Sequence, residues 1–278
     1  MKIVHLSECS TVTPVKCVVA LGCFDGVHLG HQEVIKAAKE IAHKQNMKCA
    51  VMTFSPHPKE VISRGKHKVN YLMPLADKAD KIKGLGVDLL YVVDFNLQTA
   101  ALPPKEFVEQ YLVKLHVKHV VAGFDFTYGA KGKGNMSTLK NHARGRFYVT
   151  TILPITEQRE KISSTRIRNT LKSGKVEEIP SLLGDVYQVK GEMLEMSDMF
   201  PNELSVVIYD QYTLPEAGVY EITVSVQGNT YKGSCEVHSF MQRVVSISVR
   251  DVWMFPEDTM VTICFLQQQY AKSCSVSS

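Results

Sequence analysis

Cys17-Val18-Val19-Ala20-Leu21 is an uninterrupted apolar run, and it predicts a buried strand. The run is followed by Gly22-Cys23-Phe24-Asp25-Gly26-Val27-His28-Leu29-Gly30-His31, a glycine-rich turn. The next residues, 32–42, have the periodicity of an amphipathic helix. The free N–H groups and the dipole of a helix N-terminus both favour negative charge. We therefore expect this turn to bind a triphosphate.

Two residue types in the turn suit a phosphate ligand. Gly22, Gly26 and Gly30 have no side chain, so the backbone can approach a phosphate closely. His28 and His31 lie three residues apart at the helix start and can share one face. The chain contains neither G-x-G-x-x-G at this turn nor G-x-x-x-x-G-K-[ST] anywhere, and no cluster of cysteines or carboxylates completes a zinc site. A turn with two structurally satisfied histidines remains the alternative.

The residues of the turn also carry a family resemblance. Phe24-Asp25-Gly26-Val27-His28-x-Gly-His31 resembles the signature of the nucleotidyltransferase superfamily with the HxGH motif. In this wording it resembles the adenylyltransferase module of bacterial bifunctional riboflavin kinase/FAD synthetases. The resemblance implies that ATP is bound by Gly22, Phe24, Asp25, Gly26, His28 and His31, and that both histidines are catalytic.

The composition is that of an ordinary globular protein. The chain has 278 residues, 45% of them apolar and 22% charged, which allows one large domain or two smaller ones. No apolar run is long enough to cross a membrane, and the N-terminus lacks the apolar core of a signal peptide. The seven cysteines are scattered without a C-x-x-C pair. We expect a cytoplasmic protein with no membrane partner and no metal held by protein ligands.

The charge is divided unevenly along the chain. Residues 1–182 carry 27 Lys and Arg against 16 Asp and Glu, whereas residues 183–278 carry 5 against 12. A basic first half suits phosphorylated substrates. Its basic residues are dispersed and no nucleic-acid-binding motif accompanies them, so we expect no nucleic-acid partner. The change of sign predicts a domain boundary that separates 1–182 from 183–278.

Strand and helix patterns alternate over the first half. Apolar runs occur at 17–22, 48–54, 88–94, 117–123 and 147–153, with helical patterns near 31–45, 74–84, 104–115 and 137–144. Such alternation predicts a parallel, Rossmann-like α/β sheet whose ligands bind at the carboxyl ends of the strands. Each candidate motif follows a strand.

Thr53-Phe54-Ser55-Pro56-His57-Pro58 follows the second strand. The two prolines predict a stiff loop outside a helix that carries His57. A rigid turn with an exposed imidazole is an equally good interpretation of the residues alone. The resemblance favours a role at the flavin and nucleotide site, because the FAD synthetase module has a similar Pro-His-Pro.

Gly123-Phe124-Asp125-Phe126-Thr127-Tyr128-Gly129 follows the fourth strand, before a glycine–lysine segment. Aromatic faces can flank a planar ring, and a carboxylate can accept hydrogen bonds from its edge. A strand that continues into a flexible loop is the alternative. A similar element lines the flavin and adenine sites of the family, and on that basis we assign flavin binding to His57, Gly123, Asp125, Phe126 and Tyr128.

Lys161-Ile162-Ser163-Ser164-Thr165-Arg166-Ile167-Arg168 follows the fifth strand. A serine before a helical pattern is a good N-cap, and hydroxyls beside arginines are good phosphate donors. Ser-Ser-Thr-x-Ile-Arg also resembles the second signature of the superfamily in its flavin-specific form. The resemblance implies that Ser164, Thr165 and Arg168 bind the β- and γ-phosphates, with Arg168 also catalytic.

The residue pattern of the second half is typical of β-strands. Short alternating or β-branched runs occur at 204–208, 218–226, 244–249 and 260–265, with a hairpin turn at 227–230. They predict a small antiparallel barrel, and a helical stretch from Thr170 to Leu183, broken near Gly174, precedes it.

The barrel resembles the riboflavin kinase module of the same family, but its chemistry departs from it. The kinase motif Gly-Phe-Pro-Thr-Ala-Asn is expected after Gly191, but Pro-Thr-Ala-Asn is absent there. The chain has Glu192-Met193-Leu194-Glu195-Met196-Ser197-Asp198-Met199-Phe200-Pro201-Asn202 instead. Glu236 is similar to the catalytic glutamate of the kinase, yet it follows Gly233 too closely. We therefore expect a kinase-like barrel without kinase activity.

The sequence thus predicts an FMN adenylyltransferase, which makes FAD and pyrophosphate from FMN and ATP, with Mg²⁺ carried by the ATP phosphates. Three alternatives remain: a bifunctional riboflavin kinase/FAD synthetase, a transferase acting on phosphopantetheine or nicotinamide mononucleotide, and a flavin-sensing regulatory protein.

Overall fold

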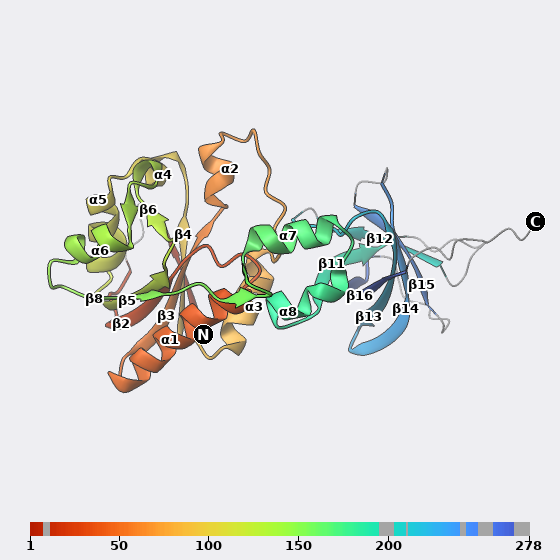
Figure 1. Ribbon diagram of the computed structural model, residues 1–278, viewed down its shortest axis with the longest axis horizontal. Helices are drawn as coiled ribbons and strands as arrows, with labels where there is room; N and C mark the ends of the chain where they lie inside the picture. Colours follow the sequence, from red (N-terminus) through yellow and green to blue (C-terminus); the bar gives the residue numbers. More distant parts are fainter. Residues whose placement is uncertain (8–11, 195–202, 210, 240–242, 250–257, 270–278) are drawn as a thin grey trace, which may run out of the picture. The chain divides into compact units, whose positions relative to one another are not determined.

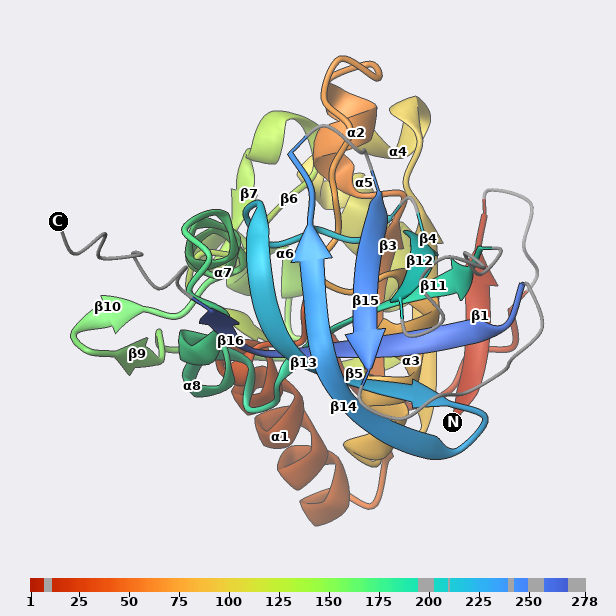
Figure 2. The same ribbon diagram turned by 90° about the vertical axis from the view of Figure 1, so that its right-hand side faces the viewer.

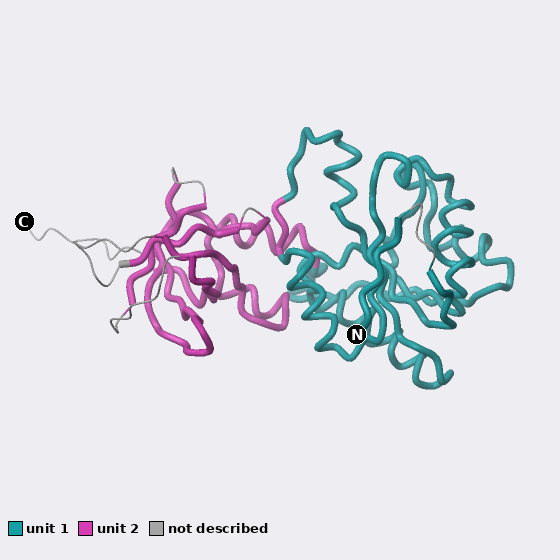
Figure 3. Tube along the Cα trace, turned by 180° about the vertical axis from the view of Figure 1, so that it is seen from behind, with its two compact units in different colours: residues 1–69, 73–162 teal, residues 70–72, 163–278 magenta. Residues whose placement is uncertain are grey.

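The computed structural model describes residues 1–7, 12–194, 203–209, 211–239, 243–249 and 258–269. The chain divides into two compact units, drawn in two colours in Figure 3. Unit 1 consists of Met1–Val69 and Met73–Ile162, and unit 2 consists of Asn70–Leu72 and Ser163–Ser278.

Unit 1 is built on a sheet of six parallel strands in the spatial order β1-β4-β3-β2-β5-β8 (Figure 1). The strands are β1 (Lys2–Leu6), β2 (Cys17–Leu21), β3 (Lys48–Ser55), β4 (Leu89–Asp94), β5 (Val117–Gly123) and β8 (Tyr148–Ile152). Five of them coincide with the apolar runs, so the predicted parallel α/β sheet is confirmed. The sixth, β1, is a sheet edge that pairs with β4, and its mostly exposed residues form no apolar run.

Helices cover both faces of this sheet. Helices α1 (Leu29–Lys44) and α3 (Leu75–Gly84) lie on one face; α5 (Pro104–Val108), its continuation η1 (Glu109–Val113), and α6 (Met136–Ala143) lie on the other (Figure 1). Successive residues of a strand point to opposite faces. Accordingly Val18 and Ala20 of β2 join the core with α1, whereas Val19 and Leu21 join the core with α5 and α6.

Short elements fill the connections of unit 1. They are α2 (Pro58–Ile62), α4 (Leu97–Ala101), β6 (Thr127–Tyr128), η2 (Ala130–Gly132), β7 (Gly134–Asn135), β9 (Thr156–Glu157) and β10 (Glu160–Lys161). One of them corrects the expectation for the Pro-His-Pro segment. Pro58 begins helix α2, because proline needs no amide partner at the first helical position and its φ suits a helix. His57 is therefore a helix N-cap and not part of an irregular loop.

The strand order places two motifs side by side. After β2 the chain adds β3 and β4 on one side, then returns to add β5 and β8 on the other. Ligands of open α/β sheets bind where the order reverses, outside the carboxyl ends of the strands. Leu21, the last residue of β2, is opposite Ala122 of β5, so Gly22, which follows β2, lies next to Gly123, which ends β5.

Unit 2 begins with helices and continues as a closed antiparallel barrel in the order β11-β12-β15-β14-β13-β16, of which Figure 2 gives a view. The helices are α7 (Ser164–Lys172), η3 (Val176–Glu178) and α8 (Pro180–Leu183). The strands are β11 (Tyr187–Met193), β12 (Glu203–Ile208), β13 (Gly218–Val226), β14 (Asn229–Val237), β15 (Val244–Val249) and β16 (Met260–Gln269). The predicted barrel is confirmed, as are the hairpin turn between β13 and β14 and the helix break at Gly174.

The helical segment before the barrel packs with it. The amide of Glu216 donates to the carbonyl of Leu171 in α7 at 2.9 Å. The compact unit consequently starts at Ser163, before the predicted boundary between residues 182 and 183. The division into functional domains 1–182 and 183–278 stays a prediction.

Candidate active site

The backbone of the glycine-rich turn is strained. Phe24, Gly26 and Val27 have φ values of 52°, 82° and 42°, in the left-handed region. Only glycine adopts this region freely, and a β-branched residue such as Val27 is rarely found there. The amide of Gly22 donates to Met52 of β3 at 3.2 Å, and that of Val27 to the Phe24 carbonyl at 3.3 Å. Surrounding contacts must hold a turn of this kind, as is common at functional sites.

The two histidines stack at the start of helix α1. His28 is the N-cap residue, and its Nδ1 accepts a hydrogen bond from the His31 amide at 3.3 Å. The rings lie 3.6 Å apart between centroids, at 16°. Gly30 makes room for them, since an added Cβ would be 3.2 Å from Cε1 of His28. With Nδ1 as the acceptor, neutral His28 carries its proton on Nε2 and can donate it to a ligand.

Both imidazoles are neutral near pH 7. Burial, and after it the Lys161 cation, lower the pKa of His28 to about 4, while Asp125 acts in the opposite direction. Burial also holds the pKa of His31 well below its usual range, with His28, Lys78 and Lys161 acting in the same direction. Nδ1 of His31 is buried and has no hydrogen-bond partner among the described residues. A bound polyphosphate would raise both pKa values, because an anion favours the charged form of a histidine.

The other turn residues assigned to ATP lie inside the fold. Phe24 is 1% exposed, and its ring meets that of His31 edge-on at 5.2 Å. The Asp25 carboxylate is buried, and its Oδ1 accepts a long hydrogen bond of 3.4 Å from the Met73 amide. Both side chains thus pack inside the turn, and ATP binding by Phe24 and Asp25 stays a prediction.

The segment after β5, the strand next to β2, contributes charged and aromatic side chains near the turn. Asp125 accepts an ion-paired hydrogen bond from Lys161 of β10, and the Lys161 ammonium also lies 4.7 Å from the centroid of the Phe124 ring. Because Lys161 and Asp125 both shift the pKa of His28, they lie within electrostatic reach of it. Phe126 is half-buried beside them, and its amide donates to the Gly123 carbonyl at 3.0 Å. Lys161 had no expected role at the site.

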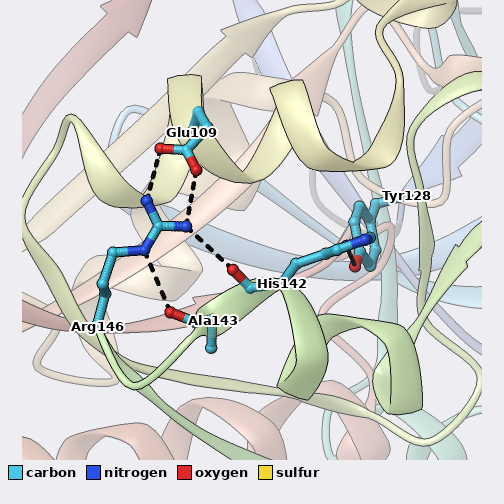
Figure 4. Close-up of polar contacts among 5 residues, drawn as sticks. All are labelled: Glu109, Tyr128, His142, Ala143 and Arg146. Carbon is cyan, nitrogen blue, oxygen red and sulfur yellow. Dashed lines mark hydrogen bonds and ion pairs between the residues drawn. The ribbon is translucent and has the colours of Figure 1, made fainter.

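Tyr128 lies in the core behind this segment. Its side chain is 4% exposed and its ring is parallel to that of Phe126, with centroids 6.2 Å apart. Its hydroxyl is 2.8 Å from Nδ1 of His142 in α6 (Figure 4). Arg146, which follows α6, forms a bidentate ion pair with Glu109, with both N–O distances at 2.7 Å. It also donates to the carbonyl oxygens of His142 and Ala143 in α6. Flavin contact by Tyr128 stays a prediction, and the geometry favours support of Phe126.

His57 caps the short helix α2. Its Nδ1 accepts a hydrogen bond from the Lys59 amide at 3.1 Å. As in His28, this bond places the proton of the neutral ring on Nε2. The imidazole is half-buried, and flavin binding by His57 stays a prediction.

The second signature lies at the start of α7 in unit 2. Ser163 caps the helix by accepting a hydrogen bond from the Arg166 amide at 3.2 Å, so Ser164 and Thr165 form its first turn. The Arg168 guanidinium donates to the carbonyl of Asn70 from Nε at 3.2 Å and from Nη2 at 3.1 Å. A helix start with two hydroxyls suits an anion. Phosphate binding by Ser164, Thr165 and Arg168 stays a prediction.

Two negative findings concern the described residues only. No group of three His, Cys, Asp or Glu side chains among them is arranged to hold a metal ion. No helix in the same part of the chain is long and apolar enough to cross a membrane.

A parallel sheet with a paired-histidine turn at its switch point defines a nucleotidyltransferase of the α/β class. The family model described as FAD synthetase matches residues 11–166. The chain is 45% identical, over 85% of its length and 78% of the relative's, to a bifunctional riboflavin kinase/FMN adenylyltransferase of Listeria monocytogenes. It is 29% identical, over 85% of its own length and 93% of the relative's, to an FAD synthetase of the same organism. The chain belongs to the FAD synthetase family.

A solved structure supports the fold of the whole chain. A crystal structure described as a macrolide-efflux protein from Streptococcus pneumoniae matches 99% of this chain and 94% of its own, with a TM-score of 0.88 and 30% identity. Its likeness therefore extends over the residues of both the sheet and the barrel.

Proposed function

We propose that the chain transfers the AMP group of ATP to FMN, giving FAD and pyrophosphate. The observation that carries this proposal is the stacked pair His28 and His31 at the start of α1, beside the switch point of the sheet. Membership of the FAD synthetase family supports FMN and ATP as its substrates. MgATP is the expected nucleotide, because Mg²⁺ keeps most of its water and binds through substrate phosphates, and the described residues offer no acidic cluster to hold it separately.

In the proposed reaction an oxygen of the FMN phosphate attacks the α-phosphorus of ATP, and the bond to the bridging oxygen of pyrophosphate breaks. The nucleophile is already ionised near neutral pH, so the step requires no general base. Catalysis then rests on positioning and on donors that meet the charge passing to pyrophosphate. His28, which donates from Nε2, and His31, which is stacked against it, contact the α- and β-phosphates and stabilise the transition state. Ser164, Thr165 and Arg168 bind the leaving pyrophosphate.

The flavin is proposed to bind next to this turn, along the segment after β5. The half-buried Phe126 offers a ring face, and Asp125 offers carboxylate oxygens to the edge of a flavin. Gly123, at the end of β5, lies next to Gly22, which supports a flavin phosphate close to the α-phosphate of ATP. His57 completes the proposed flavin set.

We further propose that the barrel has no riboflavin kinase activity. The segment that would carry the kinase motif lacks Pro-Thr-Ala-Asn, and most of it, 195–202, lies outside the described residues. Gly233 and Glu236 lie on one uninterrupted strand, β14, which supports the absence of a loop between them. The Glu236 carboxylate is 3.3 Å from Nδ1 of His238, which directly follows this strand. Retention of both activities is the alternative, and the 45% identical relative is named as a bifunctional enzyme.

One assay distinguishes these functions. Purified protein with ATP and Mg²⁺ is given FMN or riboflavin, and FMN, FAD and pyrophosphate are followed by chromatography. We expect FAD from FMN and no product from riboflavin. FMN formed from riboflavin would contradict the loss of the kinase. Flavin binding without turnover would indicate the regulatory alternative, and turnover with phosphopantetheine or nicotinamide mononucleotide alone would indicate another transferase.

The histidine pair itself is tested by substitution. We expect His31→Ala to lower kcat about 100-fold or more, the scale for losing a donor to a developing negative charge. His43→Ala, in the exposed last turn of the same helix, is the matched control and should retain full turnover. A His31→Ala variant with wild-type kcat would refute the assignment.

A further inference from the structure

A buried lysine lies beneath the glycine-rich turn. Lys78 of α3 is 3% exposed, the one lysine with a buried side chain in the described part of the chain. Lysine is almost never fully buried unless its charge is paired, since removing an ammonium from water is costly. Of the other two lysines of this helix, Lys83 is exposed and Lys81 is half-buried. Lys78 therefore has a local reason to be buried.

The Lys78 ammonium is bonded to the backbone of the turn. Its Nζ donates to the carbonyl oxygen of Cys23 at 2.9 Å and to Oγ1 of Thr53 at 3.4 Å. The Thr53 hydroxyl, which is fully buried in β3, donates to the same carbonyl at 2.8 Å. Two donors from two elements thus fix the direction of one carbonyl group.

A buried carboxylate complements this ammonium. Asp25 is 2% exposed, and its charge raises the pKa of Lys78, opposing the larger effect of burial, which lowers it. Lys78 in turn lowers the pKa of His31, so its charge reaches the histidine pair. The turn therefore rests on one buried cation and encloses one buried anion.

The fixed carbonyl determines what the turn presents on its other side. In a trans peptide the C=O and the following N–H point in opposite directions. Holding the Cys23 carbonyl against α3 and β3 directs the Phe24 amide away from them. Phe24 and Val27 both have positive φ, so the turn would relax to another conformation without such a restraint.

We propose that Lys78 is a positioning residue: its ammonium fixes the Cys23–Phe24 peptide, so that the turn presents its amide and His28 and His31 to the triphosphate of ATP. The inference rests on the proposed function, because it assigns ATP to this turn. It predicts an effect on ATP that FMN does not share.

The test compares Lys78→Met, which keeps the length of the side chain and removes its charge, with Lys83→Met on the exposed side of the same helix. We expect Lys78→Met to lower kcat and raise KM for ATP, reducing kcat/KM for ATP about 10- to 100-fold, while KM for FMN is unchanged. Lys78→Arg should recover part of this loss, since it restores a cationic donor. Lys83→Met should match the wild type. A merely structural role would lower the thermal midpoint without separating the two KM values.

The outcomes separate the two proposals. Wild-type protein that makes no FAD refutes the proposed function, and Lys78 is then judged by ATP binding in calorimetry, where Lys78→Met should bind at least about 10-fold more weakly. A folded Lys78→Met variant with wild-type values for ATP overturns the inference. Should Lys78→Met fail to fold, Thr53→Val removes the second donor to Cys23, and a few-fold rise in KM for ATP is expected; no rise overturns the inference.

Discussion

Replacing His28 with asparagine should flatten the dependence of stability on pH. Asparagine is itself a preferred N-cap, so its side-chain oxygen can accept the hydrogen bond of the His31 amide. The variant thus keeps the helix start and removes one titrating group. His28 is suited to this test because its pKa falls from 6.5 to about 4 on folding, chiefly through burial.

The sign follows from proton binding. A group whose pKa is lowered in the folded state stabilises that state above its unfolded pKa, and the stabilisation is lost as pH falls towards the folded pKa. Between pH 7 and pH 5 the unfolded chain takes up about three quarters of a proton at this position, while the folded chain takes up about a tenth. The free energy of unfolding should therefore drop by about 2 kcal/mol over this interval through His28 alone.

The assay is urea unfolding followed by far-UV circular dichroism at pH 7 and pH 5. Wild-type protein should lose about 2 kcal/mol more stability between the two pH values than His28→Asn. His43→Asn, an exposed residue of the same helix, should behave as the wild type does. An equal loss in wild type and His28→Asn would refute the inference that His28 is buried as a neutral ring.

Two further predictions concern packing. Tyr128→Phe removes a buried hydroxyl that forms a hydrogen bond of 2.8 Å with Nδ1 of His142. The substitution should lower the free energy of unfolding by about 1 kcal/mol. An unchanged midpoint of urea unfolding would contradict this hydrogen bond. Gly233→Ala places a methyl group against the carbonyl oxygen of Ser248 on the next barrel strand, and should lower the free energy of unfolding by about 2 kcal/mol or more. Gly84→Ala is the control, because its methyl group meets no atom within 4 Å. Equal thermal midpoints for the two variants would contradict this packing.

Much of the fold follows from the period of apolar residues. Runs such as Cys17–Leu21 are buried on both faces of a parallel sheet, which makes them easy to recognise. Edge strand β1 shows why the rest is harder, because four of its five residues are partly or wholly exposed and pair with a strand more than eighty residues away. Helices of five residues such as α2 carry too little periodicity to be predicted.

The candidate site was predictable where a motif is continuous and not where it depends on distant residues. The turn with His28 and His31 follows from its own sequence. Whether Tyr128 meets a ligand or the core depends on His142, which no local pattern connects to it. Lys78 did leave a signal: it lies four residues before the buried Ile82 and so falls on the apolar stripe of α3, where a lysine is out of place.

The segment Asn70–Leu72 makes the two units difficult to separate by genetic dissection. It is part of unit 2, where the Tyr71 amide donates to Gln211 at 2.7 Å and the Thr213 amide donates to Tyr71 at 2.8 Å, yet the chain on both sides of it belongs to unit 1. Cutting the chain after Ile162 separates the barrel fragment from Asn70–Leu72, so that this segment of unit 2 stays on the fragment that carries unit 1. Exchange of modules between relatives must therefore preserve three junctions at once, and recombination within this family is expected to transfer the segment and the barrel together.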